Sequence, residues 1–298
     1  MKFNLITILG PTATGKTKLA VQLADYFNGE IISADSRQVY RGMNIGTGKD
    51  LSEYFIDGRQ IHYNLIDIID PTEEFNLFSF QQSFYKSFDV ILTRNKFPFL
   101  VGGTGMYLSS ILQNYNLSKA DFETIRQEYY PLNDEALRNL LNELNPYLHN
   151  TTDLNDRNRI LNAIAIAKAQ NSNVDNVKIN SLTIGVSLSR DKIKKRITAR
   201  LKKRLDEEGM IDEVKTLMDS GVSYDKMIFF GLEYKFIAQY LIGELNKNDM
   251  FQKLNSAIHS FAKRQMTWFR KMEREGVVIN WIDGPDFNKA KKIVGEYF

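Results

Sequence analysis

One short motif near the start of the chain limits the folds that the rest can adopt. Gly10 is followed by four residues and then by Gly15, Lys16 and Thr17, which matches the phosphate-binding pattern G-x-x-x-x-G-K-[ST] in full. The motif follows an apolar run, Leu5–Leu9, that predicts a buried strand, and it precedes a stretch with helical spacing of apolar residues. This order of strand, glycine-rich turn and helix predicts a P-loop at the edge of a sheet.

The P-loop has the chemistry to hold a chain of phosphates. Its glycines let backbone amides turn toward an anion, and the start of the following helix adds positive partial charge. Lys16 supplies a mobile full charge, and the hydroxyl of Thr17 is a suitable ligand for a magnesium ion. The motif does not reveal which molecule carries the phosphates, so ATP and other phosphate compounds both remain open.

The composition indicates a globular protein of 298 residues, long enough for one core domain with an inserted one. Hydrophobic residues make up 43% of the chain, and the net charge of +3 does not by itself indicate a nucleic-acid partner. The absence of cysteine excludes disulfides and thiolate metal sites and suits a reducing cytoplasm, which is the expected location. We expect no association with a membrane, because no apolar stretch is long enough to span one.

The first third of the chain alternates between strand-like and helix-like segments. The expected elements are the strands Leu5–Leu9, Glu30–Ala34, Tyr63–Ile68 and Phe97–Val101 and the helix Phe78–Arg94. Such alternation predicts an α/β fold with a largely parallel sheet flanked by helices. Ligands of these sheets bind at the carboxyl ends of the strands, which is where the P-loop, Asp35 and the glycine-rich stretch 102–105 are expected to meet.

Two further candidates at this edge have more than one interpretation. Asp35 follows a strand and suits a magnesium ligand, a general base or a cap on the next turn, and its shared edge with the P-loop favours a role in the site. The GGTG stretch places Thr104 between glycines, where either a tight turn or close approach to a ligand would explain the composition.

The amino-acid composition changes in the middle of the chain. Residues 113–180 lack glycine and show helical periodicity, which predicts an inserted all-helical subdomain. Leu182–Leu188 has the pattern of a strand that returns to the core sheet. Helices are then expected from Arg190 to the end, with breaks near Gly209, Gly221 and Gly276. The predicted core is therefore 1–112 together with 181–298.

Two basic segments lie in the C-terminal third. Arg196, Arg200 and Arg204 follow one another at steps of four and share one helix face, which fits a solvated surface, a contact with a diphosphate or a nucleic-acid backbone. In the segment 261–271, aromatic residues at core spacing are interleaved with cations that suit an anionic partner.

Taken together, the motifs resemble the tRNA dimethylallyltransferases, also called tRNA isopentenyltransferases. The matching strings run in family order from residue 5 to about 271 and are GPTATGKT, ADSRQVY, RGMNIGTGK, HYNLIDI, PFLVGGTGMYL, NDRNRI, RITARL, GMIDEV and AKRQMTWFR. The resemblance implies a P-loop NTPase-like core whose loop grips the diphosphate of an isoprenoid donor. It implies transfer of a dimethylallyl group from dimethylallyl diphosphate to the exocyclic amine of the adenosine 3′-adjacent to the anticodon, with Mg²⁺ as cofactor and the inserted subdomain on the tRNA anticodon stem-loop.

The resemblance also implies roles for individual residues. Asp35, Thr104 and Lys16 would be catalytic, and Thr17 would hold the magnesium ion. The diphosphate would contact Gly10, Pro11, Thr12, Ala13, Thr14, Gly15, Lys16, Thr17 and Arg200. The tRNA would contact Asp35, Ser36, Arg37, Gln38, Thr104, Arg126, Arg159, Ile160, Leu161, Asn162 and Ala163. We expect the protein to act as a monomer.

The chain departs from the family pattern at three places, one of which is HYN, residues 62–64, where the family more usually has HHL. Asn162 stands where the family commonly has a second arginine, and FGLEYK, residues 230–235, replaces the usual GYKE-like string, so no role is carried over to that segment. Three rival functions remain at this point: a P-loop kinase of a small molecule, a prenyltransferase that uses free AMP or ADP, and an RNA-binding protein with a P-loop that no longer functions.

Overall fold

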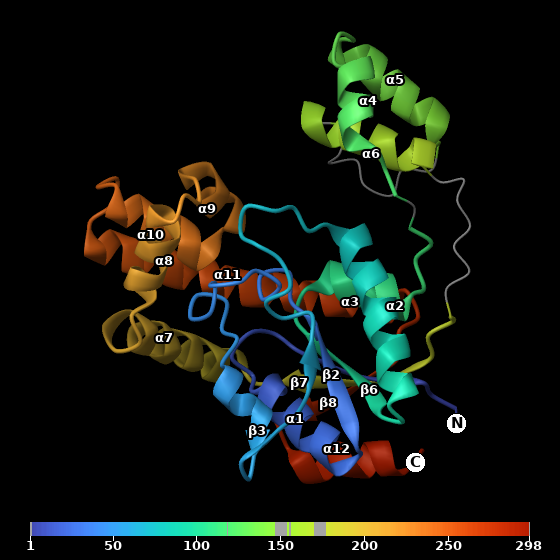
Figure 1. Ribbon diagram of the computed structural model, residues 1–298, viewed down its shortest axis with the longest axis vertical. Helices are drawn as coiled ribbons and strands as arrows, with labels where there is room; N and C mark the ends of the chain where they lie inside the picture. The colour runs from blue at the N-terminus through green and yellow to red at the C-terminus, as the bar shows by residue number, and fades with distance from the viewer. Residues whose placement is uncertain (1, 118, 147–153, 155, 170–176, 298) are drawn as a thin grey trace. The chain divides into compact units, whose positions relative to one another are not determined.

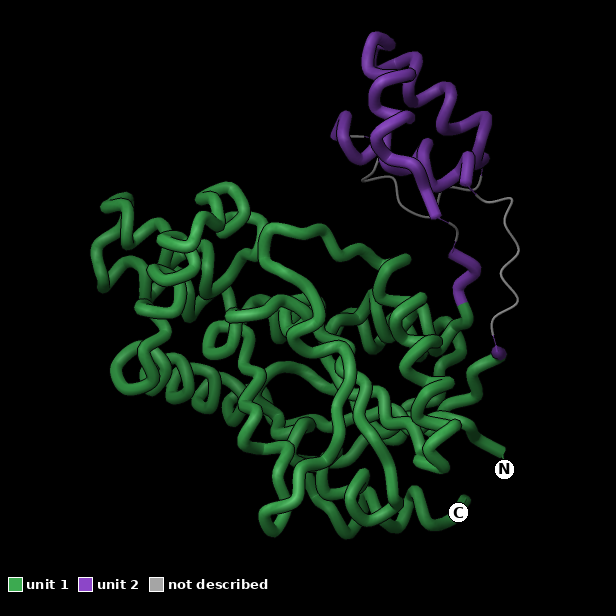
Figure 2. Tube along the Cα trace, viewed as in Figure 1, with its two compact units in different colours: residues 1–114, 178–298 green, residues 115–177 purple. Residues whose placement is uncertain are grey.

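The computed structural model describes residues 2–117, 119–146, 154, 156–169 and 177–297. The chain divides into two compact units, coloured separately in Figure 2: unit 1 comprises Met1–Asn114 with Lys178–Phe298, and unit 2 comprises Tyr115–Val177. The insertion predicted from the sequence spans residues 113–180. Each unit has a hydrophobic core of its own and is described separately below.

Unit 1 is built on a six-stranded parallel sheet with the order β5-β2-β6-β1-β7-β8 (Figure 1). The strands are β1 Leu5–Leu9, β2 Gly29–Ala34, β5 Tyr63–Asn64, β6 Phe97–Gly102, β7 Ser181–Ser187 and β8 Ile279–Asp283. The predicted α/β class with a parallel sheet is confirmed. A 3₁₀ turn, Leu51–Tyr54, leads into a separate hairpin of β3 Phe55–Ile56 and β4 Arg59–Gln60.

Alternation along the strands gives the sheet two apolar faces. In β1, Ile6 and Ile8 face a layer made by α1 (Lys16–Tyr26) and α12 (Phe287–Gly295). Leu5 and Leu9 face the opposite layer, which is made by α2, α3 and the C-terminal half of α11. These three helices span Leu77–Thr93, Gly105–Leu112 and Lys247–Arg274. Because both faces are covered, the central strands are buried along almost their whole length.

A third apolar cluster joins the remaining helices of unit 1 to the loop after β2. These helices are α7 Arg190–Asp206, α8 Met210–Asp219, α9 Tyr224–Phe230 and α10 Leu232–Leu241. In Figure 1, α8, α9 and α10 lie together beside α11, and α10 packs against each of the other three. The predicted breaks near Gly209, Gly221 and Gly276 are confirmed, since each glycine has positive φ next to the end of a helix.

The structure corrects two predicted elements of the sheet. The predicted strand Tyr63–Ile68 ends at Asn64, because Leu65 and Asp67 adopt left-handed φ angles of 62° and 56° that no strand accommodates. The region after Gly276 contains β8 as well as helix, although the prediction there was helical. Of the five residues of β8, Ile282 is buried and the other four are not, which matches the weak apolar pattern of the strand.

Unit 2 is a small helical bundle. It consists of α4 Phe122–Tyr129, α5 Asp134–Leu144 and α6 Arg157–Ala169. Its core is formed by Ile125, Leu137, Leu141, Ile160, Leu161, Ile164 and Ala165. Asp121 and Asn133 cap α4 and α5 by accepting a hydrogen bond from the backbone amide of the third residue of each helix.

Candidate active site

The P-loop joins β1 to α1 and leaves the start of that helix open. A Cβ at Gly10 would lie 2.5 Å from the carbonyl oxygen of Val186, so only glycine lets the loop pass this close to β7. Gly15 has φ of +85° and makes no side-chain cap, so the first amides of α1 are free of any capping side chain. Free amides at a helix start form a binding site for an anion.

Lys16 is the mobile cation of the loop. Among the described residues, its Nζ donates a single long hydrogen bond, 3.4 Å, to the carbonyl of Pro11. Burial lowers the pKa of Lys16 to about 8, while the nearby carboxylate of Asp35 opposes that shift. A cation held this loosely is available to a phosphate.

The predicted basic face of α7 meets the P-loop. Arg200 donates a hydrogen bond to the hydroxyl of Thr12 at 2.5 Å, and Arg196 approaches the carbonyls of Ala13 and Thr14 at 3.4 Å. Burial and the neighbouring Arg204 lower the pKa of Arg200 to about 10. The alternative of a purely solvated basic face is therefore wrong for Arg200, which faces the same cavity as Lys16.

Asp35 and Thr104 follow neighbouring strands and are tied together by backbone amides. Asp35 Oδ1 accepts a hydrogen bond from the amide of Arg37 at 2.9 Å, and Thr104 Oγ1 accepts one from the amide of Ser36 at 3.1 Å. The amide of Thr104 donates to the carbonyl of Ala34 at 3.2 Å. Within the described residues Asp35 Oδ2 makes no hydrogen bond, so it is free to accept one from a ligand.

The glycines around Thr104 are required by packing. A Cβ at Gly102 would lie 2.2 Å from the carbonyl of Ala34, and one at Gly105 would lie 2.3 Å from the indole of Trp268. The turn interpretation therefore explains the glycines. Thr104 itself lines the cavity, so the turn also presents a hydroxyl to it.

Gln265 of α11 connects the two loops and was not identified from the sequence. Its Oε1 accepts a hydrogen bond from the amide of Thr12 at 2.9 Å, and its Nε2 donates to the carbonyl of Gly103 at 2.9 Å. The side chain is only 6% exposed. The motif AKRQMTWFR contains this residue, but no local pattern indicates a bond across 253 positions of sequence.

A single cavity of about 480 Å³ collects these groups. That volume lies within the range of small-molecule sites. Its wall includes Thr12, Ala13, Gly15, Lys16, Thr17, Asp35, Thr104 and Arg200. Gly10, Pro11 and Thr14 belong to the P-loop but are not among the residues that line the cavity, and the carbonyl of Pro11 accepts a hydrogen bond from the buried hydroxyl of Thr14 at 3.0 Å. The cavity also includes Arg204, the third arginine of the predicted basic face, and Glu233, which the sequence did not single out for a ligand.

Two of the residues expected to contact tRNA also form hydrogen bonds within the protein. Arg37 donates to the carbonyls of Phe230 and Phe229 at 3.0 and 2.9 Å, which fixes its guanidinium at the end of α9. Gln38 accepts a hydrogen bond from Ser33 and donates one to the carbonyl of Gly48 at 3.1 Å. Ser36 and both of these residues nevertheless line the cavity.

The expected tRNA contacts in unit 2 fall into two groups. Arg126 and Arg159 are exposed and present cations to solvent. Ile160 and Leu161 are 0% and 1% exposed, so their side chains form the core of the bundle and do not reach a ligand. Asn162, which replaces the usual arginine, accepts a hydrogen bond from Arg126 at 3.4 Å, and Ala163 packs at the edge of that core.

The site suits a magnesium ion only if the substrate supplies most of the ligands. Thr17 lines the cavity, and its hydroxyl makes no hydrogen bond within the described residues, which leaves it free to bind a metal. In the same part of the chain no cluster of three or more histidine or acidic side chains could hold an ion. Mg²⁺ typically combines few protein ligands with water and substrate phosphates, so these residues fit it.

Comparison with known proteins gives consistent matches. Residues 38–272 match the family model described as IPP transferase. The chain is 52% identical over 299 residues to tRNA dimethylallyltransferase 1 of Geotalea uraniireducens, which covers 99% of this chain and 98% of the relative. It is 48% identical over 301 residues to tRNA dimethylallyltransferase 2 of Phocaeicola vulgatus, with 98% and 97% covered.

Solved structures agree with the sequence matches. The crystal structure of the tRNA isopentenylpyrophosphate transferase of Bacillus halodurans superposes with a TM-score of 0.68 at 34% identity, covering 98% of this chain and 94% of that one. The crystal structure of the Staphylococcus epidermidis tRNA Δ²-isopentenylpyrophosphate transferase has a TM-score of 0.70 at 29% identity, with 99% of both chains covered.

Among the described residues, no helix combines the length and the apolar character needed to span a membrane.

Proposed function

Because the chain belongs to the IPP transferase family, we propose that it transfers a dimethylallyl group from dimethylallyl diphosphate to the exocyclic amine of the adenosine 3′-adjacent to the anticodon of tRNA. The products are N6-isopentenyladenosine and diphosphate. One observation carries the proposal: the phosphate-binding groups and the Asp35–Thr104 pair share one cavity. A donor and an acceptor can therefore meet there without leaving the protein.

The donor half of the cavity stabilises the leaving group. As the allylic carbon–oxygen bond breaks, its electron pair leaves with the diphosphate, and negative charge grows there. The open amides of α1, Lys16 and Arg200 stabilise this charge more strongly as it develops, which lowers the barrier. Mg²⁺, held by Thr17 and the phosphates, would supply further positive charge at the diphosphate.

The acceptor half orients a weak nucleophile. Asp35, through its free Oδ2, accepts a hydrogen bond from the exocyclic amine and takes its proton as the new carbon–nitrogen bond forms. Thr104 supports this arrangement from the neighbouring loop. The adenine must leave the anticodon-loop stack to reach the cavity, which costs a few kcal/mol. Because the exocyclic amine is a weak nucleophile, its alignment with the allylic carbon contributes as much to the rate as the basicity of Asp35.

In this proposal, unit 2 binds the tRNA. Its exposed Arg126 and Arg159 would contact phosphates of the anticodon stem-loop, while its buried core keeps the three helices together. The cavity is lined by residues of one chain, and we propose that a cytoplasmic monomer carries out the reaction.

The proposal is tested with purified protein, dimethylallyl diphosphate, Mg²⁺ and unmodified tRNA, followed by mass analysis of the nucleosides. The expected result is isopentenyladenosine at one position and an equal amount of diphosphate. Parallel reactions replace tRNA with AMP or ADP, or replace the donor with ATP. Prenylation of the free nucleotide alone would overturn the choice of acceptor, and phosphoryl transfer from ATP without prenylation would overturn the proposed reaction.

A further inference from the structure

Three consecutive backbone amides in the loop after β2 converge on one carboxylate of α8. The amides of Asn44 and Ile45 donate to Glu213 Oε2 at 2.8 and 2.7 Å, and the amide of Gly46 donates to Oε1 at 3.1 Å. The hydroxyl of Tyr234 donates to the same Oε1 at 2.8 Å. Successive amides that face one point form a nest for an anion, and here Glu213 fills it.

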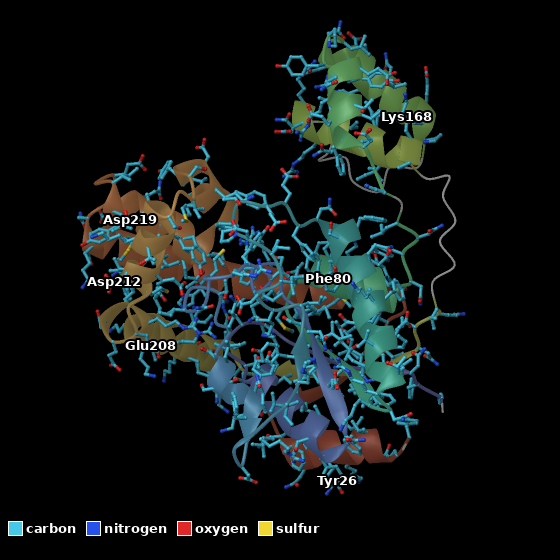
Figure 3. The ribbon with its side chains drawn as sticks, viewed as in Figure 1. Tyr26, Phe80, Lys168, Glu208, Asp212 and Asp219 are labelled. Atoms are coloured by element: carbon cyan, nitrogen blue, oxygen red, sulfur yellow. The ribbon has the colours of Figure 1, made fainter. Side chains whose placement is uncertain are left out.

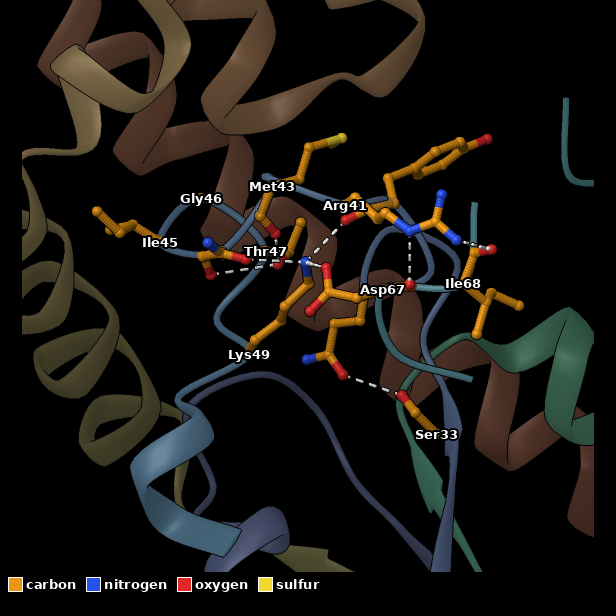
Figure 4. Close-up of polar contacts among 12 residues, drawn as sticks. Ser33, Arg41, Met43, Ile45, Gly46, Thr47, Lys49, Asp67 and Ile68 are labelled. Atoms are coloured by element: carbon orange, nitrogen blue, oxygen red, sulfur yellow. Dashed lines mark hydrogen bonds and ion pairs between the residues drawn. The ribbon is translucent and has the colours of Figure 1, made fainter. Parts of the chain in front are cut away.

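A buried ammonium fastens the same loop from within (Figure 4). Lys49 is 1% exposed, and its Nζ donates to the carbonyl of Tyr40 at 2.7 Å, to Asn44 Oδ1 at 3.0 Å and to the carboxylate of Asp67. All three protons of the ammonium group are therefore used. Burial lowers the pKa of Lys49, and the contacts with Asp67 and the charge of Glu213 oppose that shift. The loop 44–50 is thus held by the carboxylate of Glu213 from α8 and by the ammonium group of its own Lys49.

The loop 44–50 forms part of the cavity wall. Gly46, Thr47, Gly48 and Asp50 all line it, and a Cβ at Gly46 would lie 2.7 Å from the ring of Tyr234. The carbonyl of Gly48 accepts the hydrogen bond from Gln38, whose Oε1 accepts one from Ser33 at 2.9 Å. Gln38 belongs to the short segment that begins at Asp35. A continuous series of hydrogen bonds therefore runs from Glu213 through the loop to the segment that carries Asp35.

Arg204 of α7 donates to Asp50 of the loop at 3.0 Å, but the direct contacts around the P-loop make no use of this series. Arg200 contacts Thr12 directly, and Gln265 joins Thr12 to Gly103. Neither contact includes Glu213 or a residue of the loop 44–50. A change at Glu213 is therefore expected to move the acceptor half and to leave the donor half in place.

We propose that Glu213 is a positioning residue for the transfer reaction, which acts by holding the loop 44–50 and, through Gly48 and Gln38, the segment of Asp35. This inference rests on the proposed function only for its expected effect on the reaction rate. The contact between Glu213 and the loop 44–50 can be measured without any reaction, so the inference and the proposed function can be contradicted independently.

The test compares Glu213→Gln with Asp212→Asn. Glutamine keeps the size of the side chain, but its amide nitrogen replaces an oxygen that accepts hydrogen bonds, so the four donors can no longer all be satisfied. Asp212, labelled in Figure 3, precedes Glu213 in the same first turn of α8 and is exposed. Its replacement removes the same charge from the same turn without touching the loop.

The first measurement is hydrogen exchange of the amides of residues 44–46. Glu213→Gln should exchange them at least about tenfold faster, and Asp212→Asn should leave them as in the unchanged protein. Equal protection in both variants would overturn the hold on the loop. This result does not depend on which reaction the protein catalyses.

The second measurement separates kcat from donor binding. Glu213→Gln should lower the single-turnover rate with saturating donor and tRNA by about 10- to 100-fold, while the Kd of the donor stays within about twofold. Gln38→Leu should lower the rate as well, and the double variant should be no slower than the slower single one, because both act through one series of bonds. Additive losses, or an equal loss of donor affinity, would overturn the positioning role.

Discussion

The hydroxyl of Thr104 accepts a hydrogen bond from the backbone amide of Ser36 at 3.1 Å. This bond fastens the loop after β6 to the loop after β2, and the amide of Thr104 reinforces it through the carbonyl of Ala34 at 3.2 Å. Thr104 and Asp35 are therefore held at the same edge of the sheet by contacts that do not need a ligand. Such preorganisation lets the acceptor meet groups that are already in place.

Replacing Thr104 by valine keeps its shape and removes the acceptor of the Ser36 amide. An unpaired amide of this kind costs ~1–3 kcal/mol of stability. Because the loop of Asp35 also loses a contact that positions it, we expect Thr104→Val to lower the single-turnover rate by about 10- to 100-fold. The Kd of the donor should change little, since the P-loop is untouched. Thr104→Ser, which keeps the hydroxyl, is the matched control and should restore most of the rate; equal rates for the two variants would contradict the role of the hydroxyl.

Gln265 joins the P-loop to the loop of Thr104, so its loss should affect both stability and donor binding. Gln265→Leu removes both bonds and should lower the free energy of unfolding by ~1–3 kcal/mol in a denaturant titration. Gln265→Glu can still accept from Thr12, but it places a second acceptor beside the carbonyl of Gly103 and a negative charge beside the P-loop. The glutamate variant should therefore bind the donor more weakly than the leucine variant, and the reverse order would contradict this account.

The lowered pKa of Lys16 predicts a pH dependence of donor binding. The protonated amine binds the diphosphate, and its pKa in the free protein is about 8. The affinity for the donor should accordingly be full below pH 8 and should fall as the pH rises through 8, approaching tenfold per pH unit. Calorimetric titration at several pH values measures it. Lys16→Arg stays charged throughout this range, so its profile should lack the inflection, and an unchanged inflection would assign the titration to another group.

The exposed arginines of unit 2 should act on tRNA and not on the donor. Arg126→Ala and Arg159→Ala should each raise the apparent Kd for tRNA and reduce the slope of its logarithm against the logarithm of salt concentration by about 1. Filter binding over a series of salt concentrations provides both quantities. Asn158→Ala, an exposed and uncharged neighbour of Arg159, is the control. A loss of affinity with an unchanged salt slope would show that these arginines do not contact phosphates.

The parts of the fold predicted from sequence are those with strong local signals. The P-loop pattern, the apolar strands around it and the glycines at helix ends each act within a few residues, and the structure places them as expected. The strand at 63–68 was predicted too long because two residues in left-handed conformations interrupt an otherwise apolar run. Strand β8 was missed because its partial burial leaves no clear apolar pattern.

The site was predictable to the extent that parallel strands end at one edge. This rule brought Asp35, Thr104 and the P-loop together, and the shared face of α7 brought Arg200 to them. Gln265 and Glu213 could not be found in this way, because each bonds to backbone atoms more than 160 positions away. A backbone amide or carbonyl leaves no trace in the sequence of the loop that offers it.

The account depends most on Asp35, and Asp35→Asn tests it most directly. Asparagine can still accept the hydrogen bond from the amide of Arg37 through its side-chain oxygen, so the loop keeps its geometry while the basic group is lost. The decisive measurement is the single-turnover rate of dimethylallyl transfer to unmodified tRNA, made together with the Kd values of donor and tRNA. The account predicts a fall in rate of at least about 100-fold with both Kd values within about threefold. A variant that transfers the dimethylallyl group at nearly the normal rate would contradict it.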